Sequence, residues 1–175
     1  NEVAIQSDPG FMGIADFNND GKAELYVRDA VYDAATLNVI VPSSQPINGQ
    51  NTINSGPVAV DILGDRKLEL IAGGTILDID IGTGTSTVLQ TLPRYFVKTT
   101  GKTWAPNNSS TSVADFNQDG YLDVICSGAL DSPTGPTTVF FWDVHNNTSK
   151  HFIVPSNWAL GTSRLNIADI DGDGQ

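Results

Sequence analysis

The chain has 175 residues, of which 39% are hydrophobic, and a formal net charge of −11. This composition is typical of a globular protein with a sizeable core and argues against disorder. No apolar run approaches the ~20 residues that a membrane-spanning helix needs, so we expect no membrane insertion. The first ten residues lack a basic region followed by an apolar one, so we expect any secretion signal to have been removed or to lie outside this sequence.

The negative charge is concentrated in four short segments of similar sequence. Residues 16–24, 61–69, 115–123 and 169–173 hold three acids each, which is twelve of the twenty in the chain. The other eight acids face nine Lys and Arg residues, so the rest of the chain is nearly neutral. Because no basic stripe is present to neutralise phosphates, nucleic acid is not an expected partner.

Taken in chain order, the apolar runs predict strands and no helices. Two runs flank each of the first three acidic segments, namely FMGIAD and ELYVRD, PVAVDI and LELIAGG, and TSVADF and LDVICSG. Two further runs follow within each unit, namely AVYDA and LNVIV, TILDIDI and STVLQTL, and TVFFWDV and KHFIVPS. Gly, Pro, Asn and Ser cluster between them. Each acidic segment is therefore predicted to join two strands of a hairpin.

The acidic segments start at residues 16, 61, 115 and 169, a spacing in the range of propellers and solenoids. Four short strands in each unit of ~50 residues is the arrangement of a β-propeller blade. We predict an all-β fold in which residues 1–175 form one partial β-propeller domain, with four antiparallel strands in each blade. The repeats fall at approximately 8–55, 56–108, 109–162 and 163–175, which makes three blades and the start of a fourth. A β-sandwich of seven or eight strands is the alternative, but it does not explain why one turn chemistry recurs at the same place.

The pattern resembles the integrin-type FG-GAP repeats and the related VCBS repeats of bacterial surface proteins. The motifs that carry the resemblance are IADFNNDGKAELYV and VADFNQDGYLDVIC, and more loosely VAVDILGDRKLELIAG and IADIDGDGQ. The resemblance implies a larger propeller of seven or eight blades, with calcium in the loop between the first two strands of a blade. Residues 127–129 and 72–74 read SGA and AGG in place of the integrin signatures, which favours the bacterial type of repeat. We expect the remaining blades to come from the same or another chain.

The acidic segments also present oxygen donors at alternate positions. We number each segment from its first acid. In the first segment the donors at positions 1, 3, 5, 7 and 9 are Asp16, Asn18, Asp20, Lys22 (through its backbone carbonyl) and Glu24. Gly21 at position 6 permits the positive φ that the reversal requires. A donor set made only of oxygen selects a hard cation, and calcium accepts such a loose shell more readily than magnesium does. The expected cofactor is therefore calcium.

The four segments are not equally complete. The third is complete and supplies Asp115, Asn117, Asp119, Tyr121 (through its backbone carbonyl) and Asp123. The fourth supplies Asp169, Asp171 and Asp173. The second has Leu63 in place of a donor at position 3 and Arg66 in place of glycine at position 6. We expect Arg66 to resist positive φ and its guanidinium to balance the carboxylates, so the second segment is predicted to bind metal weakly or not at all.

The acidic segments fit two alternatives to this metal loop less well. An EF-hand would need helices and a bidentate Glu at position 12, where this chain has Val27 or Cys126 in strand-like runs. A metal-free Asp/Asn/Gly hairpin turn remains the other alternative, and the recurrence of the pattern argues against it. Position 2 is always apolar, and we expect these residues to pack between neighbouring blades: Phe17, Ile62, Phe116 and Ile170.

Residues that could support catalysis are few. His145 and His151 flank a polar turn where a solvated role is expected, and no nucleophile, zinc-protease or phosphate-binding motif is present. Asp78 and Asp80 would share one strand face, which reads as an exposed surface. Cys126 lies in an apolar run without cationic neighbours, so a buried, inert thiol is predicted.

The three tryptophans are the remaining residues of interest. Trp142 is predicted to pack between blades, whereas Trp104 and Trp158 lie in loop-like stretches and are candidates for stacking on a ligand such as a sugar. The sequence as a whole predicts a secreted or cell-surface, calcium-stabilised module that mediates binding, adhesion or scaffolding through a protein or glycan ligand. A carbohydrate-active propeller, either a polysaccharide lyase or a sugar-binding protein, is the alternative, and the question of enzymatic activity stays open.

Overall fold

The computed structural model describes residues 11–43, 56–93, 95–97, 102–104, 107–129, 137–154 and 167–168. Within these ranges every regular element is a β-strand, which confirms the all-β class. None of the described residues belongs to a helix long and apolar enough to span a membrane.

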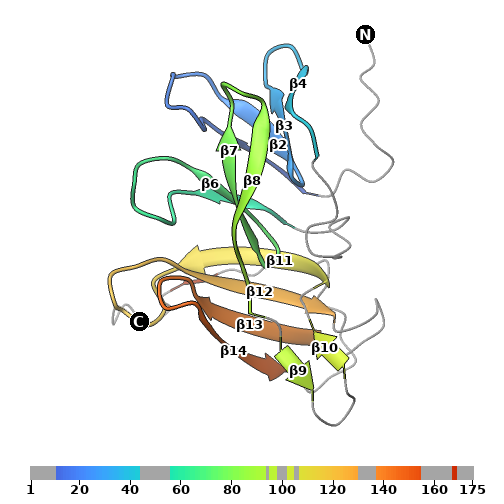
Figure 1. The fold of residues 1–175 in the computed structure, drawn as a ribbon, viewed down its shortest axis with the longest axis vertical. Helices are drawn as coiled ribbons and strands as arrows, with labels where there is room; N and C mark the ends of the chain where they lie inside the picture. The colour runs from blue at the N-terminus through green and yellow to red at the C-terminus, as the bar shows by residue number, and fades with distance from the viewer. Residues whose placement is uncertain are drawn as a thin grey trace.

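Twelve of the strands form three antiparallel sheets of four, each built from one contiguous stretch of chain (Figure 1). The N-terminal sheet contains β1 (Met12–Ala15), β2 (Glu24–Val27), β3 (Ala30–Asp33) and β4 (Val39–Val41). The middle sheet contains β5 (Val58–Val60), β6 (Glu69–Ala72), β7 (Thr75–Asp80) and β8 (Thr85–Thr91). The C-terminal sheet contains β11 (Asn107–Ala114), β12 (Asp123–Ala129), β13 (Thr137–Asp143) and β14 (Thr148–Ile153). In each sheet the strands pair in chain order.

The strands predicted around and after the acidic segments are thus confirmed for all three described units. One further hairpin, β9 (Tyr95–Val97) with β10 (Lys102–Trp104), was not predicted from the sequence. Trp104 ends β10, so the expectation that it lies in a loop was wrong. Trp158 lies outside the described residues.

The sheets pack face to face in chain order, with one apolar core on each side of the middle sheet. Strand β6 shows why, because all four of its residues are buried and successive side chains point to opposite faces. Leu70 belongs to the core against the N-terminal sheet, and Ile71 belongs to the core against the C-terminal sheet. A strand that is buried on both faces cannot show the apolar–polar alternation of a half-exposed strand.

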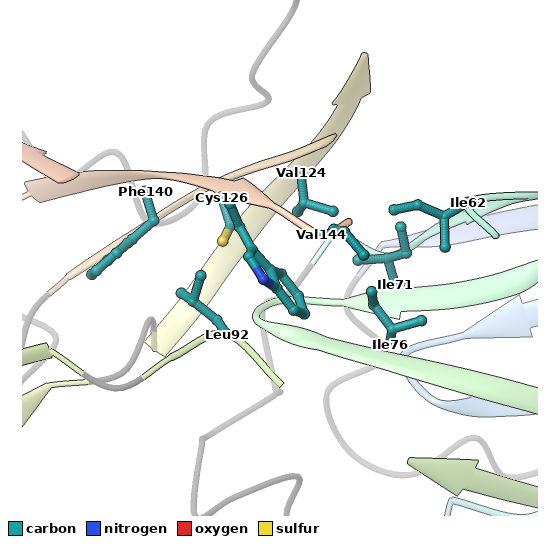
Figure 2. Close-up of a cluster of buried hydrophobic side chains, with 9 residues drawn as sticks. Ile62, Ile71, Ile76, Leu92, Val124, Cys126, Phe140 and Val144 are labelled. Carbon is teal, nitrogen blue, oxygen red and sulfur yellow. The ribbon is translucent and has the colours of Figure 1, made fainter. Parts of the chain in front are cut away.

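Figure 2 shows the second of these cores. Ile62, Ile71 and Ile76 of the middle sheet and its first loop lie opposite Val124 of β12 and Val144 in the turn after β13. Trp142 is fully buried in the same cluster, which confirms that it packs between two sheets.

The apolar residues at position 2 do not all behave alike. Phe17 and Ile62 are buried in the first and second cores, as expected. Phe116 is only half-buried and makes an edge-to-face ring contact with Phe141 of its own sheet, with the ring centroids 6.1 Å apart. Ile170 lies outside the described residues.

Strand β1 contains Gly13, where the adjacent Tyr26 of β2 leaves no room for a side chain. Gly13 pairs with Tyr26 across β1 and β2, and a β-carbon at residue 13 would collide with the tyrosine ring. We expect Gly13→Ala to lower the free energy of unfolding by about 1–3 kcal/mol, because the ring must leave its place in the core. Gly56→Ala is the matched control, since a β-carbon there would meet Phe11 only at an ordinary 3.6 Å. Chemical denaturation of both variants measures the difference, and equal stabilities would contradict the prediction.

Candidate metal centre

The three described acidic segments form the loops between the first two strands of their sheets. We name them loop 1 (residues 16–23), loop 2 (residues 61–68) and loop 3 (residues 115–122). All three protrude from the same side of the stacked sheets, on the left in Figure 1. The acidic loops that repeat in the sequence therefore also lie at equivalent places in the structure.

The acid at position 1 anchors each loop through two backbone hydrogen bonds. In loop 1, Asp16 accepts the N–H groups of Asp20 at 3.1 Å and Gly21 at 2.8 Å. In loop 3, Asp115 accepts the N–H groups of Asp119 at 3.1 Å and Gly120 at 2.8 Å. Gly21 and Gly120 have φ values of +84° and +89°, which confirms the expected use of glycine at position 6.

Positions 3 and 5 complete the internal frame of each loop. Asn18 Oδ1 accepts the N–H of Asp20 at 3.1 Å, and Asp20 Oδ1 accepts the N–H of Lys22 at 2.8 Å. Loop 3 repeats both bonds with Asn117, Asp119 and Tyr121. Each of these oxygens retains a second lone pair. The side chains are held inside the loop and can still accept a further partner.

The acid at position 9 is buried beneath each loop. Glu24 and Asp123 are 5% and 3% exposed, and they accept the N–H groups of Phe17 and Phe116 at position 2. The other oxygen of Asp123, Oδ1, is buried without a hydrogen-bond partner. Burial raises the pKa of Asp123, and the charges of Asp143 and Asp119 raise it further. A buried carboxylate oxygen without a hydrogen-bond partner is costly to the folded state.

Loop 2 has the same frame although its sequence departs from the pattern. Asp61 accepts the N–H groups of Asp65 at 3.0 Å and Arg66 at 2.8 Å. Arg66 adopts a φ of +74°, so the expectation that it would avoid positive φ was wrong. Two hydrogen bonds to Asp61 and one from Asn19 to the Arg66 carbonyl hold the backbone there in spite of the strain. Among the described residues, Arg66 forms no ion pair with the carboxylates it was expected to balance.

Glu69 is the position 9 acid of the second segment and corresponds to Glu24 of the first. It is 1% exposed and accepts the N–H of Ile62, and burial raises its pKa, with Asp65 and Asp61 raising it further. A raised pKa in the folded state means that the ionised side chain opposes folding at neutral pH, and this cost fades as the pH falls through that pKa.

We expect Glu69→Gln to leave stability at pH 7 unchanged or to raise it by up to about 1 kcal/mol, because the amide oxygen can still accept the Ile62 N–H without a buried charge. Glu24→Gln, made for comparison, should instead reduce the stabilisation that calcium gives. Thermal unfolding of both variants with and without calcium measures the contrast, and the prediction fails if the two respond alike.

Loop 2 also permits a gain-of-function prediction. The double variant Leu63→Asn, Arg66→Gly restores the donor at position 3 and removes the strained residue at position 6, which costs about 1–2 kcal/mol. We expect this variant to bind one more calcium per chain than the native sequence, as measured by isothermal titration calorimetry. The single variant Arg66→Gly is the control, because it relieves the strain without adding the donor. An unchanged stoichiometry in the double variant would contradict the prediction.

The predicted ligands of the first and third segments lie in loops 1 and 3 and at the first residues of β2 and β12. No three His, Cys, Asp or Glu side chains within the described ranges are gathered closely enough to hold a metal ion. In loops 1 and 3 the carboxylates are instead engaged by backbone N–H groups. The predicted ligands of the fourth segment, Asp169, Asp171 and Asp173, lie outside the described residues.

Two contacts at the loops were not foreseen from the sequence. The Asn19 side chain donates to the Arg66 carbonyl at 2.9 Å and so joins loop 1 to loop 2. Tyr121 of loop 3 stacks on His145, with ring centroids 3.8 Å apart and an interplanar angle of 6°. Both contacts link residues that are distant in sequence, so no local sequence pattern predicts them.

The residues considered for catalysis have structural partners. His151 contacts Phe140, whereas His145 contacts Tyr121, so the two histidines have different partners. Asp80 accepts the N–H of Thr83, which lowers its pKa and identifies it as a turn residue. Cys126 is fully buried, as predicted, and burial raises the pKa of its thiol to about 12.

Comparison with known proteins bears on the fold. No family model matches the chain, and no match was found among curated proteins. Among solved structures, the chain is similar to one described as the V. cholerae biofilm matrix protein Bap1, with a TM-score of 0.55 and 20% sequence identity. The match covers 82% of this chain and 20% of that chain, so this chain corresponds to about a fifth of that protein. The likeness is one of fold.

Proposed function

We propose that the chain is a calcium-stabilised part of an extracellular β-propeller that mediates adhesion or scaffolding. In this proposal the three sheets are consecutive blades, and loops 1 and 3 hold the cations. Loop 2 is a blade loop of the same shape that binds weakly or is empty. The metal ligands are those predicted from the sequence in the first and third segments, with the fourth segment, Asp169, Asp171 and Asp173, supplying a further set.

The observation that carries the metal proposal is the donor chemistry of the repeated loop. Asp, Asn and backbone carbonyl oxygens are concentrated there, Gly permits the reversal, and the lone pairs left over are suited to a hard cation. The buried, unpartnered Oδ1 of Asp123 supports a cation at loop 3, because a positive charge would compensate both its burial and the repulsion from Asp119. The ligating oxygens would move closer together on binding than they lie here.

The packing of the sheets supports the propeller arrangement. The first strands of neighbouring sheets contact one another, β1 with β5 and β5 with β11, and Gly56 beside β5 bridges to Ser110 of β11. In a propeller, the blades surround a common axis. Their first strands therefore contact one another, and their faces stack in chain order.

An extracellular role in adhesion is supported by two independent points. Calcium outside cells is abundant enough to fill sites with Kd values of ~10⁻⁴–10⁻³ M. The solved structure that the chain resembles is described as a biofilm matrix protein. The ligand in this proposal is a protein or a glycan, and no nucleic acid or membrane is involved.

Calcium titration by calorimetry, with terbium luminescence as a second readout, tests the metal sites directly. We expect saturable binding that Asp20→Asn reduces at loop 1 and Asp119→Asn reduces at loop 3, with magnesium competing poorly. Binding that neither substitution alters would place the cation elsewhere and overturn the assignment. A glycan array and a lyase assay on the calcium-loaded chain then test the ligand: glycan binding without cleavage fits adhesion, and cleavage would favour a carbohydrate-active propeller.

A further inference from the structure

Asn117 in loop 3 uses both ends of its side-chain amide. Its Oδ1 accepts the N–H of Asp119 at 3.0 Å, and its Nδ2 donates to Oδ2 of the same residue at 3.0 Å. The Nδ2 atom also donates to Oδ2 of Asp143, outside the loop, at 3.5 Å. An amide can turn over about its last bond, because its oxygen and its NH₂ group are nearly alike in shape. The two carboxylates around the NH₂ group therefore fix the side on which Oδ1 lies.

Asp143 reaches this amide from another part of the same sheet. It ends β13, and the register that pairs Val124 with Trp142 places it opposite Asp123, the position 9 acid. Its carboxylate also accepts the backbone N–H and the side-chain Nδ2 of Asn146, both at 2.9 Å. The turn between β13 and β14 thus holds the Asp143 carboxylate in place beside loop 3.

A ring contact holds the same turn against loop 3. Tyr121 at position 7 stacks on His145, with the ring centroids 3.8 Å apart and an interplanar angle of 6°. His145 lies two residues after Asp143 in the sequence. Loop 3 and the turn therefore meet at two points, the ring stack and the hydrogen bond from Asn117.

Loop 1 has the same parts without this contact. Its position 3 amide, Asn18, donates to Asp20 at 3.2 Å. The acid that ends the third strand of that sheet, Asp33, accepts the N–H of Thr36 at 2.7 Å within its own turn. Within the part of the chain that the structure describes, no hydrogen bond joins Asn18 to Asp33, and position 7 is Lys22, which has no ring to stack. The turn acid is thus common to both sheets, and its bond to the loop is particular to loop 3.

We propose that Asp143 is a positioning residue for a cation at loop 3. It holds the NH₂ group of Asn117, so that Oδ1 stays on the side of the loop donors and need not turn when the cation binds. The role depends on the proposed calcium site and adds to it a residue from outside the acidic segment. Removing an outer-shell group that orients a metal ligand typically weakens metal binding by about 10–100-fold.

Calcium titration of the chain followed by ¹⁵N NMR gives each loop its own midpoint. Gly21 and Gly120 report on loops 1 and 3, because each donates its N–H to the first acid of its loop. The titration is made in about 150 mM KCl, which screens exposed charges beyond ~8 Å. A general loss of negative charge then has little effect on the midpoints.

We expect Asp143→Asn to raise the calcium midpoint at Gly120 at least about tenfold and to leave the midpoint at Gly21 unchanged. The amide oxygen of the variant can still accept the Asn146 N–H, so the turn is retained. Its NH₂ group cannot accept the hydrogen bond from Asn117. Asp143→Ser, whose hydroxyl can also accept a turn N–H, takes its place if the asparagine variant does not fold.

Two further variants separate positioning from a general effect. Asp33→Asn removes the equivalent turn acid beside loop 1 and should change the midpoint at Gly21 by less than about threefold, because only a screened charge is lost. Asn117→Asp puts at position 3 a carboxylate, whose two equivalent oxygens need no orienting. Adding Asp143→Asn to that variant should change the midpoint at Gly120 by less than about threefold. A merely structural role in the turn would give the same loss with either residue at position 3.

The outcomes distinguish this role from the calcium site itself. If Gly120 does not respond to calcium in the native chain, both proposals are overturned. If Gly120 responds in the native chain and its midpoint is unchanged in Asp143→Asn, only the positioning role is overturned. An equally large loss in Asp33→Asn at loop 1, or in the Asn117→Asp background at loop 3, would overturn the positioning role as well. The NMR spectrum of each calcium-free variant shows that it is folded.

Discussion

In about 10 mM calcium the chain is expected to unfold roughly 10–20 °C above its melting temperature in excess chelator, if loops 1 and 3 bind with Kd values of ~10⁻⁴ M. Each occupied loop then contributes about 2.7 kcal/mol by mass action, because the cation binds the folded loop and not the unfolded chain. Differential scanning calorimetry across a calcium series measures the shift.

Matched variants assign this shift to the loops. Asp20→Asn and Asp119→Asn together should abolish most of it, because each removes a charge at position 5 and keeps an oxygen that can accept the backbone N–H. Asp65→Asn makes the same change in loop 2, where position 3 offers no donor, and should leave the shift intact. A melting temperature that is indifferent to chelator in the native chain would contradict a stabilising role for the metal.

Trp142→Ala is expected to lower the free energy of unfolding by about 3–5 kcal/mol, because removing a fully buried indole leaves a cavity that the surrounding side chains fill only in part. Trp142 lies in the core where the middle and C-terminal sheets meet. The loss should therefore weaken the contact between sheets as well as the sheet that carries the residue. Urea denaturation measures the change.

A thiol probe reports where the damage falls. A thiol reagent reaches Cys126 only after unfolding, because the side chain is buried in the same core. Burial also raises the pKa of the thiol to about 12, so little reactive thiolate is present in the folded chain. The native chain should react with a disulfide reagent at pH 8 only as fast as it opens, and Trp142→Ala should react markedly faster. Phe152→Ala removes an aromatic side chain that is 48% exposed and is the control, with a small effect on both measurements. Equal reactivity of Cys126 in all three proteins would show that the core around Trp142 is not a barrier.

The sequence predicted the hairpins and the loop frame well because both are local. Asp16, Asn18, Asp20 and Gly21 sit within one loop, and their roles follow from turn chemistry that involves no distant residue. The burial of Phe17 and Ile62 was also predicted, because an apolar residue recurs at position 2 of every acidic segment.

The remaining features depend on packing between distant segments. The positive φ of Arg66 was missed because propensity favours glycine, whereas three hydrogen bonds hold the backbone in that conformation. The hairpin of β9 and β10 has short strands with weak alternation. Phe17 is buried against the middle sheet, whereas no following sheet covers Phe116 among the residues that the structure describes, and the local sequence does not encode this difference.

Each sheet is made from an unbroken stretch of chain in which every strand pairs with its sequence neighbour. Such hairpins close short loops, so the entropy lost in bringing the strands together is small and each sheet can form before its neighbours do. This local pairing of strands also has an evolutionary consequence. Duplicating or deleting one stretch of about 50 residues adds or removes an entire sheet without changing any other strand pairing, so a stack of such sheets can lengthen or shorten by simple gene duplication.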